Sequence, residues 1–495
     1  MQRKEKRDEF AGTEQGGQES KPVWLFLERL IFYGLLSVIA LSAIPYGTVE
    51  PWWIALFECV VFVLGALWFL TGLARSDWRL PPTSLLWPLV ALLLFVFLQT
   101  IDFGGSPGTT EIQGALRGTI SADPYETRLA LLKLLALILT FILLLRHAAS
   151  HGRLRMLIYV VIGIAVVSAL FGILRQTTHR NSMGFFLPYL KPDSGYGQFI
   201  NRNHFAFLME MAFGLVFGLL IGGGVSRDRV LLYLSLVMPV WFALILSNSR
   251  GGIFSMLGQL IFAALLFTLV RAPLMKTSGG WGASGWLRLV KNSVVTRVLL
   301  IVCLAIAVAF SVVWIGGDQL ASRIEMGQAE ASVEKIESRQ GESRSEVWRA
   351  TWSLIKDNPF VGVGFGGYWA VIPKYHDASG ELTPQQAHND YLEVLASGGL
   401  IGTALCAWLA LVMLKRARLQ LRSTDNFRRA ACFGALVGLF GVAVHSLFDF
   451  GLHITVNALV AVILIVLATA DVRGPGGKSR GKETSGQRLS SDYQG

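Results

Sequence analysis

The sequence has few cysteines and few charged residues for its length. Its 495 residues include four cysteines, and charged residues make up 16% of the chain. All four cysteines fall within apolar runs, and no CxxC or mixed His/Cys spacing occurs, so neither a disulfide framework nor a cysteine-based metal site is expected. We interpret the four as small buried apolar side chains: Cys59, Cys303, Cys406 and Cys432.

Long polar domains are also absent from most of the chain. Hydrophobic residues account for 53% of the sequence, and the mean hydropathy is +0.51. A soluble domain of this composition would expose large apolar patches, whereas a polytopic membrane protein requires such a composition. The net charge of +11 includes no basic stripe with interleaved aromatic residues on a soluble segment. We therefore expect the phospholipid bilayer as a partner and no nucleic acid.

Apolar runs of about 20 residues predict an all-α polytopic membrane protein with about twelve transmembrane helices. Because the hydrocarbon region contains no water, runs of this length must satisfy their backbone hydrogen bonds internally, as helices do. The runs are 24–46, 52–74, 83–101, 128–147, 155–175, 203–222, 228–247, 252–270, 297–316, 391–414, 430–449 and 453–471.

Basic residues predict the orientation of these helices. The loops on the side of the two termini hold about 28 Lys and Arg and the opposite loops about 13, and such an excess marks the cytoplasmic side. The expected divisions are a disordered N-terminal tail (1–22), helices one to nine (23–316), a long external loop with an interfacial helix (317–390), helices ten to twelve (391–471) and a disordered C-terminal tail (472–495). Both tails are expected to be cytoplasmic.

Three polar motifs precede helices that are predicted to enter the membrane from outside: NRNHFAF (201–207), SNSRGG (247–252) and QQAHNDYLE (385–393). A helix N-terminus presents free N–H groups and partial positive charge, so three on one face form a site suited to an anion. Arg202 and Arg250 add guanidinium groups that bind phosphate with paired hydrogen bonds. The alternative is that each arginine only anchors its helix at the interface.

The third motif contains a histidine that helix capping does not require. Asp390, followed three residues later by Glu393, predicts an N-cap with a capping-box partner. His388 lies just before this cap. For Asn389 and Asp390, capping alone is an equally good explanation.

The external loop ends in a segment with helical periodicity. Trp348, Trp352 and Ile355 recur at helical spacing, which predicts an amphipathic helix lying at the interface or covering a cavity. Asp357-Asn358-Pro359 is expected to end it. The Gly-rich stretch VGVGFGGYW (361–369) follows, and it is a weak signal for a nucleotide-binding loop because no strand precedes it.

The order of these motifs resembles the bacterial O-antigen ligase/polymerase family. RSEVWRATWSLIKDNPFVGVGFGGY followed by HNDYLEVLASGGLIG is similar to its signature region, and NRNHFAF, SNSRGG and HSLFDFGLHI (445–454) are similar to its other motifs. The resemblance spans roughly 195–455. It implies a GT-C-like membrane glycosyltransferase of the bacterial inner membrane whose active site faces the periplasm.

The resemblance also implies the substrates and the partners. The donor would be a glycan linked to undecaprenyl pyrophosphate, the acceptor a glycan or a lipid A-core, and a chain-length regulator protein would be a further partner. Ligases, O-antigen or exopolysaccharide polymerases and protein O-oligosaccharyltransferases share these motifs, so the choice among them stays open.

The residues allow a metal-independent glycan transfer. No D-x-D motif or carboxylate cluster is predicted on the external face, so we expect neither a cofactor nor a metal. His388 is the predicted general base for the acceptor hydroxyl, because imidazole titrates near neutral pH, although it could instead bind the pyrophosphate. The predicted pyrophosphate ligands are Arg202, Arg250, Arg344 and Asn389, and the predicted supporting residues are Asn203, Asp390, His445 and Asp449.

His445 and Asp449 are four residues apart in the run 430–449, which predicts that they share one face of a helix near the external border. Polar pairs inside a membrane usually mark function, and the alternative is a structural hydrogen bond between helices. The carboxylate could orient a catalytic histidine, but the sequence does not determine which one. We expect His204 and His453 to be interfacial rather than catalytic.

A transporter or flippase of an anionic lipid-linked glycan is the competing functional class. It would also place arginines at helix ends, and twelve helices suit it. However, no pair of Gly/Pro-broken helices occurs in matching halves of the sequence. The polar residues also concentrate on one face, whereas a carrier needs a site that both faces can reach. Glycan transfer is therefore the preferred hypothesis.

Overall fold

The computed structural model describes residues 22–76, 84–103, 118–148, 150–178, 195–271, 344–376 and 384–471. Within these ranges the protein is helical, with two isolated β-bridges and no strand. Nine of the described helices are long and apolar enough to cross a membrane, and two shorter apolar helices accompany them. The prediction of an all-α polytopic membrane protein is confirmed. The predicted span 297–316 and nearly all of both predicted tails lie outside the described residues.

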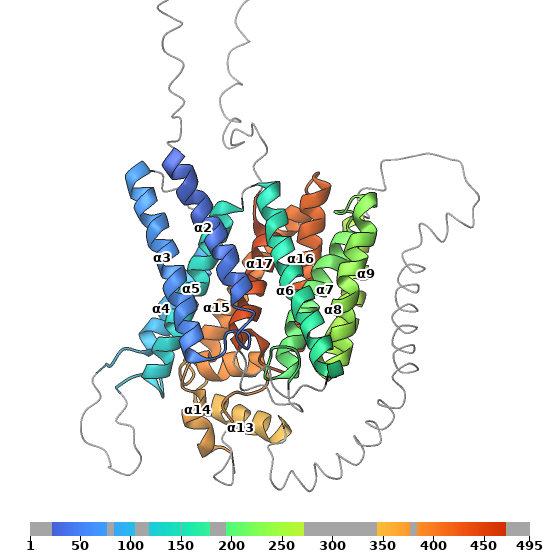
Figure 1. Cartoon of the computed structure of the whole chain (residues 1–495). Coiled ribbons are helices and arrows are strands. Elements are labelled where there is room, and N and C mark those ends of the chain that lie inside the picture. The colour runs from blue at the N-terminus through green and yellow to red at the C-terminus, as the bar shows by residue number, and fades with distance from the viewer. Residues whose placement is uncertain are drawn as a thin grey trace, which may run out of the picture.

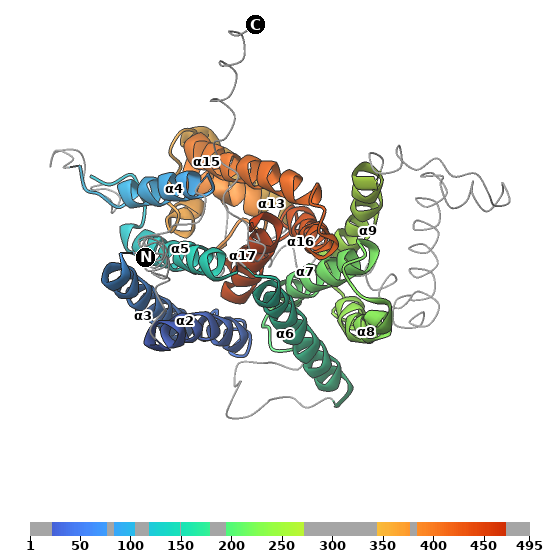
Figure 2. The same cartoon turned by 90° about the horizontal axis from the view of Figure 1, so that it is seen from above.

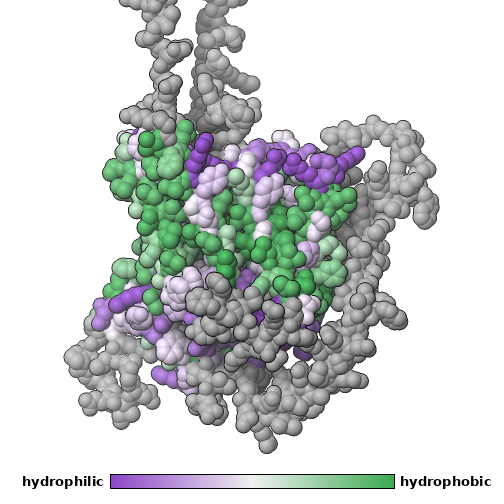
Figure 3. All heavy atoms as spheres, viewed as in Figure 1, coloured by the Kyte–Doolittle hydropathy of each residue, from purple (hydrophilic) through white to green (hydrophobic). Residues whose placement is uncertain are grey.

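The helices form one bundle with a small layer beneath it (Figure 1). The bundle contains α2 (Pro22–Leu41), α3 (Pro51–Arg75), α4 (Leu86–Gln99), α5 (Pro124–His147), α6 (His151–Thr178), α7 (Arg202–Ile221), α8 (Val230–Leu246), α9 (Arg250–Arg271), α15 (Asp390–Leu421), α16 (Asn426–His445) and α17 (Thr455–Thr469). On the face seen in Figure 3, apolar side chains form a band across the bundle and hydrophilic ones gather at its two ends, as a bilayer requires.

Helices α7, α16 and α17 lie at the centre of the bundle, and the others surround them (Figure 2). The pair α7 and α16 packs closely because glycines face each other: a Cβ on Gly214 would lie 2.7 Å from Gly438 Cα, and one on Gly218 would lie 2.3 Å from Gly434 Cα. Small residues let membrane helices approach at backbone distance. This contact fixes the start of α7 relative to the end of α16, where the polar motifs meet.

Helix α15 is broken, and the Gly-rich stretch fills the break. Gly399 has non-helical dihedrals (φ 59°, ψ −162°) inside α15. The Leu400 N–H donates to the Pro359 carbonyl (2.8 Å), and the Val363 N–H donates to the Ala396 carbonyl (3.0 Å). The free backbone groups at the break are therefore satisfied by another part of the chain, as burial requires.

Gly362 and Gln99 show how the Gly-rich stretch 361–369 packs against α15. Gly362 has φ +65°, and a Cβ there would lie 2.4 Å from the Ser397 carbonyl carbon, so only glycine fits without strain. The Gln99 amide donates to the Val361 carbonyl (2.9 Å) and the Ser397 carbonyl (3.1 Å). VGVGFGGYW is thus a backbone-docking segment that holds the external layer against α15.

The external layer contains α13 (Arg344–Asp357), α14 (Tyr368–Val371) and the short 3-10 helix η3 (Ile372–Lys374). Helix α13 ends at Asp357, as predicted. Its Trp348 indole N–H donates to the Ala387 carbonyl (3.0 Å), whereas Trp352 is exposed. The amphipathic helix therefore covers the segment that leads into His388.

The three described cysteines differ in burial, and Cys303 lies outside the described residues. Cys432 is buried in α16, Cys406 is intermediate and Cys59 is exposed on α3. The expectation of burial is therefore wrong for Cys59, because α3 lies at the rim of the bundle (Figure 2) and exposes apolar side chains such as Leu56 and Val63.

Candidate functional site

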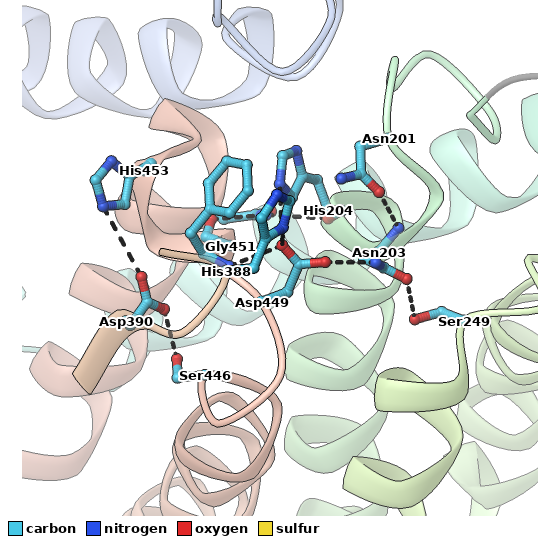
Figure 4. Close-up of polar contacts among 12 residues, drawn as sticks. Asn201, Asn203, His204, Ser249, His388, Asp390, Ser446, Asp449, Gly451 and His453 are labelled. Atoms are coloured by element: carbon cyan, nitrogen blue, oxygen red, sulfur yellow. Dashed lines mark hydrogen bonds and ion pairs between the residues drawn. The ribbon is translucent and has the colours of Figure 1, made fainter. Parts of the chain in front are cut away.

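A buried carboxylate, Asp449, connects the polar motifs (Figure 4). Its side chain is 1% exposed and lies in the turn after α16. The Phe450 backbone N–H donates to Asp449 Oδ1 (2.9 Å), and the Asn203 amide donates to Oδ2. Asn203 in turn accepts a hydrogen bond from the Ser249 hydroxyl (2.8 Å), which lies just before α9. Asp449 is therefore tied to the N-terminal ends of α7 and α9.

Three basic side chains also approach Asp449. His388 Nδ1 lies 3.4 Å from Oδ1, Arg344 Nη2 lies 3.5 Å from Oδ2, and His204 Nε2 lies 3.9 Å from Oδ1. Burial raises the pKa of the Asp449 carboxyl, but the nearby His388 and His204 side chains and the Phe450 N–H outweigh burial and hold this pKa below its usual range. The carboxylate therefore stays ionised at neutral pH.

His388 adopts a backbone conformation that is uncommon for a residue with a side chain. Its φ is 49°, in the left-handed region. The neighbouring Ala387 is fixed on both sides, because its N–H donates to Glu393 Oε2 (3.0 Å) and its carbonyl accepts from Trp348. The imidazole meets the Phe450 ring edge to face, with centroids 4.9 Å apart. Conformations of this kind persist where the surrounding structure enforces them and are common at functional sites.

Asn389, rather than Asp390, is the N-cap of α15. Its Oδ1 accepts hydrogen bonds from the N–H groups of Tyr391 (3.0 Å) and Leu392 (3.1 Å), and its Nδ2 donates to the Leu447 carbonyl (3.0 Å). The predicted capping box at Asp390 is therefore wrong, because the helix begins one residue earlier than that motif requires. The amide of Asn389 is fully used in positioning α15 beside the turn after α16.

Asp390 is the first residue of α15 and joins it to α16. Its carboxylate accepts from the Ser446 hydroxyl (2.7 Å), and its N–H donates to the Ser446 carbonyl (3.0 Å). His453 lies beside this pair, with Nε2 3.3 Å from Glu393 Oε1. These contacts fix the backbone that follows His388 relative to the backbone that precedes Asp449.

His445 does not share a helix face with Asp449, contrary to the prediction. Helix α16 ends at His445, and Asp449 follows in a turn. His445 Nδ1 instead contacts Glu210 Oε2 (3.1 Å), and both side chains are fully buried. The Phe207 ring stacks on the imidazole with centroids 4.0 Å apart. His445 thus contacts Glu210 and Phe207 of α7 rather than Asp449.

His445 also lies directly beneath the first turn of α9. A Cβ on Gly251 would lie 2.6 Å from His445 Nε2. The SNSRGG motif therefore needs glycine where α9 crosses the imidazole. Glu210 was missed by the sequence analysis, although a single acidic residue within an apolar run is a recognisable signal of an interior polar contact.

The three arginines begin three different helices. Arg202 and Arg250 are the first residues of α7 and α9, and both side chains are exposed. Arg344 begins α13 and reaches Asp449. Because α7, α9 and α15 start at the same end of the bundle (Figure 1), the three predicted helix N-termini lie on one face.

Two other residues of the site were missed or misjudged. Ser249 was not singled out, although it links Asn203 to the start of α9. His204 was expected to be interfacial, but it is buried beside Asp449 and meets Phe450 edge to face at 4.8 Å. Within the described ranges, no group of three or more His, Cys, Asp or Glu side chains is arranged to hold a metal ion. The absence of a cofactor and of a metal stays a prediction.

Comparison with known proteins supports the resemblance seen in the motifs. Residues 233–407, about a third of the chain, match the Wzy_C family, which is described as O-antigen ligase. No curated protein matches the chain. The matched region includes Arg250, Arg344 and His388, whereas Asn203 and Asp449 lie outside it and are joined to it by the contacts described above. The similarity of residues 233–407 to this family confirms the predicted resemblance to the O-antigen ligase/polymerase family.

Proposed function

We propose that this membrane protein transfers or polymerises glycan repeat units from an undecaprenyl-pyrophosphate donor to an acceptor hydroxyl at the periplasmic leaflet. The family supports glycan ligation or polymerisation in general. The observation that carries the specific reaction is the contact between His388 Nδ1 and the buried, ionised Asp449. This pair is the arrangement that a general base needs.

Asp449 is proposed to select the tautomer of His388. An ionised carboxylate accepts a hydrogen bond, so it favours the tautomer with the proton on Nδ1 and leaves the Nε2 lone pair unprotonated. His388 Nδ1 lies 3.4 Å from Asp449 Oδ1, and the His388 side chain is 34% exposed. Nε2 is therefore available to a hydroxyl group that enters the site.

The proposed reaction proceeds in one displacement. The acceptor hydroxyl gives its proton to His388 Nε2 while its oxygen forms a bond to the anomeric carbon of the donor glycan. The bond from that carbon to the pyrophosphate oxygen breaks, and undecaprenyl pyrophosphate leaves with the electron pair. The proton then passes from His388 to solvent or to the leaving group.

The leaving pyrophosphate gains negative charge, and the arginines are proposed to stabilise it. Arg202, Arg250 and Arg344 lie at the starts of α7, α9 and α13, beside the helix N-termini on the same face. Fixed positive groups that meet charge as it develops are a large source of catalytic stabilisation. We keep Asn389 as a positioning residue for this site rather than a direct ligand, because its amide is engaged within the protein.

The orientation is tested by cysteine labelling. In a variant without native cysteines, Lys374→Cys on the external layer should react with an impermeant thiol reagent in spheroplasts. Arg422→Cys at the far end of α15 should react only after lysis, because the basic end is expected to face the cytoplasm. The reverse pattern would refute a periplasmic site and cytoplasmic termini.

The anion site is tested at Arg250. Arg250→Ala should lower glycan transfer in membrane vesicles by about 10²–10³-fold, the usual effect of removing one such donor. Arg250→Lys should also lose most activity, because a lysine keeps the charge but not the planar paired donors. Arg349→Ala, an exposed arginine on α13, is the matched control and should retain activity. Near-full activity in both Arg202→Ala and Arg250→Ala would rule out the anion site.

The acceptor is identified by the glycolipids of a deletion strain. Loss of long chains with single repeat units still attached to the lipid core would indicate a polymerase, for which a chain-length regulator is the expected partner. Accumulation of polymer on the polyprenyl carrier would indicate a ligase. Unchanged surface glycans together with impaired movement of the lipid-linked unit would favour a flippase and contradict the proposal.

A further inference from the structure

A polar pair lies in the apolar interior of the bundle, apart from the contacts around Asp449. Glu210 lies in the middle of α7 and His445 is the last residue of α16, and Glu210 Oε2 lies 3.1 Å from His445 Nδ1. Both side chains are fully buried. Ionisable side chains inside a membrane are costly and usually have a function. The reaction proposed above gives neither side chain a step.

The His445 ring is held on three sides. Phe207 stacks on one face, with ring centroids 4.0 Å apart and ring planes at 16°. Glu210 contacts Nδ1, and among the described residues Nε2 has no hydrogen-bond partner. The edge that carries Nε2 instead lies against Gly251, where a Cβ would be 2.6 Å from Nε2 and 2.7 Å from Cδ2. The imidazole therefore supports the first turn of α9.

Helix α9 turns a stripe of small and polar residues toward α7 and α16. Gly251, Ser255 and Gln259 are spaced four residues apart, so they lie on one helix face. The Ser255 hydroxyl donates to the Gly441 carbonyl of α16 (2.6 Å), and the Gln259 amide donates to the Glu210 carbonyl of α7 (2.9 Å). These contacts hold α9 against both helices and fix its rotation about its own axis.

The first turn of α9 also carries Arg250, which is proposed to stabilise the leaving pyrophosphate. Consecutive Cα atoms are about 3.8 Å apart, so Gly251 cannot move without moving Arg250. Ser249, just before this turn, donates its hydroxyl to Asn203 of α7 (2.8 Å; Figure 4). The contacts with Asn203 and with the His445 ring therefore set the position of the Arg250 backbone.

We propose that Glu210 is a positioning residue for glycan transfer. Through His445 it sets the distance of the first turn of α9 from α16, and thereby where Arg250 meets the pyrophosphate. This inference rests on the proposed function. The role requires the contact with His445 Nδ1 rather than a negative charge, so an amide should replace the carboxylate.

Two substitutions of Glu210 test this requirement. Glu210→Leu should lower glycan transfer in membrane vesicles by at least about tenfold and up to about 10²-fold, because a displacement of about 1 Å can have such an effect. Glu210→Gln keeps a polar contact with the imidazole and should retain most of the activity. If both variants have the wild-type melting temperature and are equally impaired, the carboxylate has a charge or proton role and the inference fails.

A double-mutant cycle separates the positioning of Arg250 from general damage. In the Arg250→Ala background, Glu210→Leu should cause a further loss of less than about twofold, because the group that Glu210 positions is already absent. The same loss in both backgrounds would mean that Glu210 acts elsewhere, and would overturn the inference alone. Near-full activity of Arg250→Ala would refute the anion site of the proposed function and the inference with it.

Gly251→Ala tests the contact between the His445 ring and α9. The added methyl group would meet the imidazole, so this variant should lose activity, whereas the same change in a His445→Ala background should cost little more. Gly258→Ala on the same helix is the matched control and should retain activity, because its Cβ would lie at an ordinary contact distance of 3.4 Å from Phe440 Cε1. An equal cost of Gly251→Ala with and without the ring would refute the contact and the inference.

Thiol labelling of Arg250→Cys measures the displacement without any substrate. In the protein without native cysteines, Glu210→Leu should change the rate at which an impermeant reagent modifies position 250 severalfold, whereas Glu210→Gln should not. An unchanged rate in Glu210→Leu would show that the turn has not moved and would overturn the inference, even if the protein transferred no glycan.

Discussion

Replacing His388 by alanine is expected to lower glycan transfer by about 10²–10⁴-fold, the usual contribution of a positioned general base. Its imidazole is the group that lies against the buried carboxylate of Asp449. Donor binding should remain, because the arginines that are proposed to bind the pyrophosphate are unchanged. The measurement is product formation in membrane vesicles, with protein amount and donor affinity determined in parallel.

His388→Gln distinguishes the two roles that an imidazole could have. A glutamine amide can donate a hydrogen bond to phosphate, but it cannot accept a proton at neutral pH. An inactive glutamine variant with normal donor binding supports the base, whereas substantial activity would mean that His388 only binds the donor. His376→Ala removes another histidine of the external layer and serves as the control with retained activity. Wild-type activity in His388→Ala would mean that the HND motif only begins α15.

Asp449→Asn is expected to have an effect of similar size, a loss of about 10²–10⁴-fold in kcat. The amide would offer an N–H to His388 Nδ1 and so favour the tautomer whose Nε2 is already protonated and cannot accept a proton. The carboxylate is ionised across the neutral range because its pKa is lowered, so this substitution removes a charge that is always present. Asp357→Asn, whose carboxylate accepts from Tyr375 on the external layer, is the matched control.

A double variant shows whether Asp449 acts through His388. If it does, His388→Gln/Asp449→Asn should be no less active than His388→Gln alone, because residues that act as a unit are not additive. If the activity loss of the double variant equals the product of the losses of the two single variants, the two residues act independently. Asp449 would then contribute in another way, for example through Arg344. The melting temperature of each variant separates these outcomes from unfolding.

The sequence by itself determined the class of the protein and the starts of its polar helices. The length of the apolar runs dictates membrane helices, since only internally hydrogen-bonded segments are stable in lipid. The NRN, SNSR and HND motifs place α7, α9 and α15 to within a residue or two, because caps and first-turn residues act locally. His388, Arg202 and Arg250 could be selected from these motifs.

Only the tertiary structure decided which of these residues meet. The apolar residues after His445 continue the hydropathy signal, so the end of α16 and the turn that carries Asp449 are not visible in the sequence. Glu210 and His445 are far apart along the chain and are joined by the close packing of α7 against α16. His388 and Asp449 are also distant in sequence, and they meet because the start of α15 is bonded to the end of α16 through Asp390 and Ser446. The conformation of the Gly-rich stretch likewise cannot be explained locally. Its backbone forms hydrogen bonds with the backbone groups left free by the break in α15 at Gly399. Local sequence sets where a helix begins, whereas contacts between distant segments set which side chains share a proton.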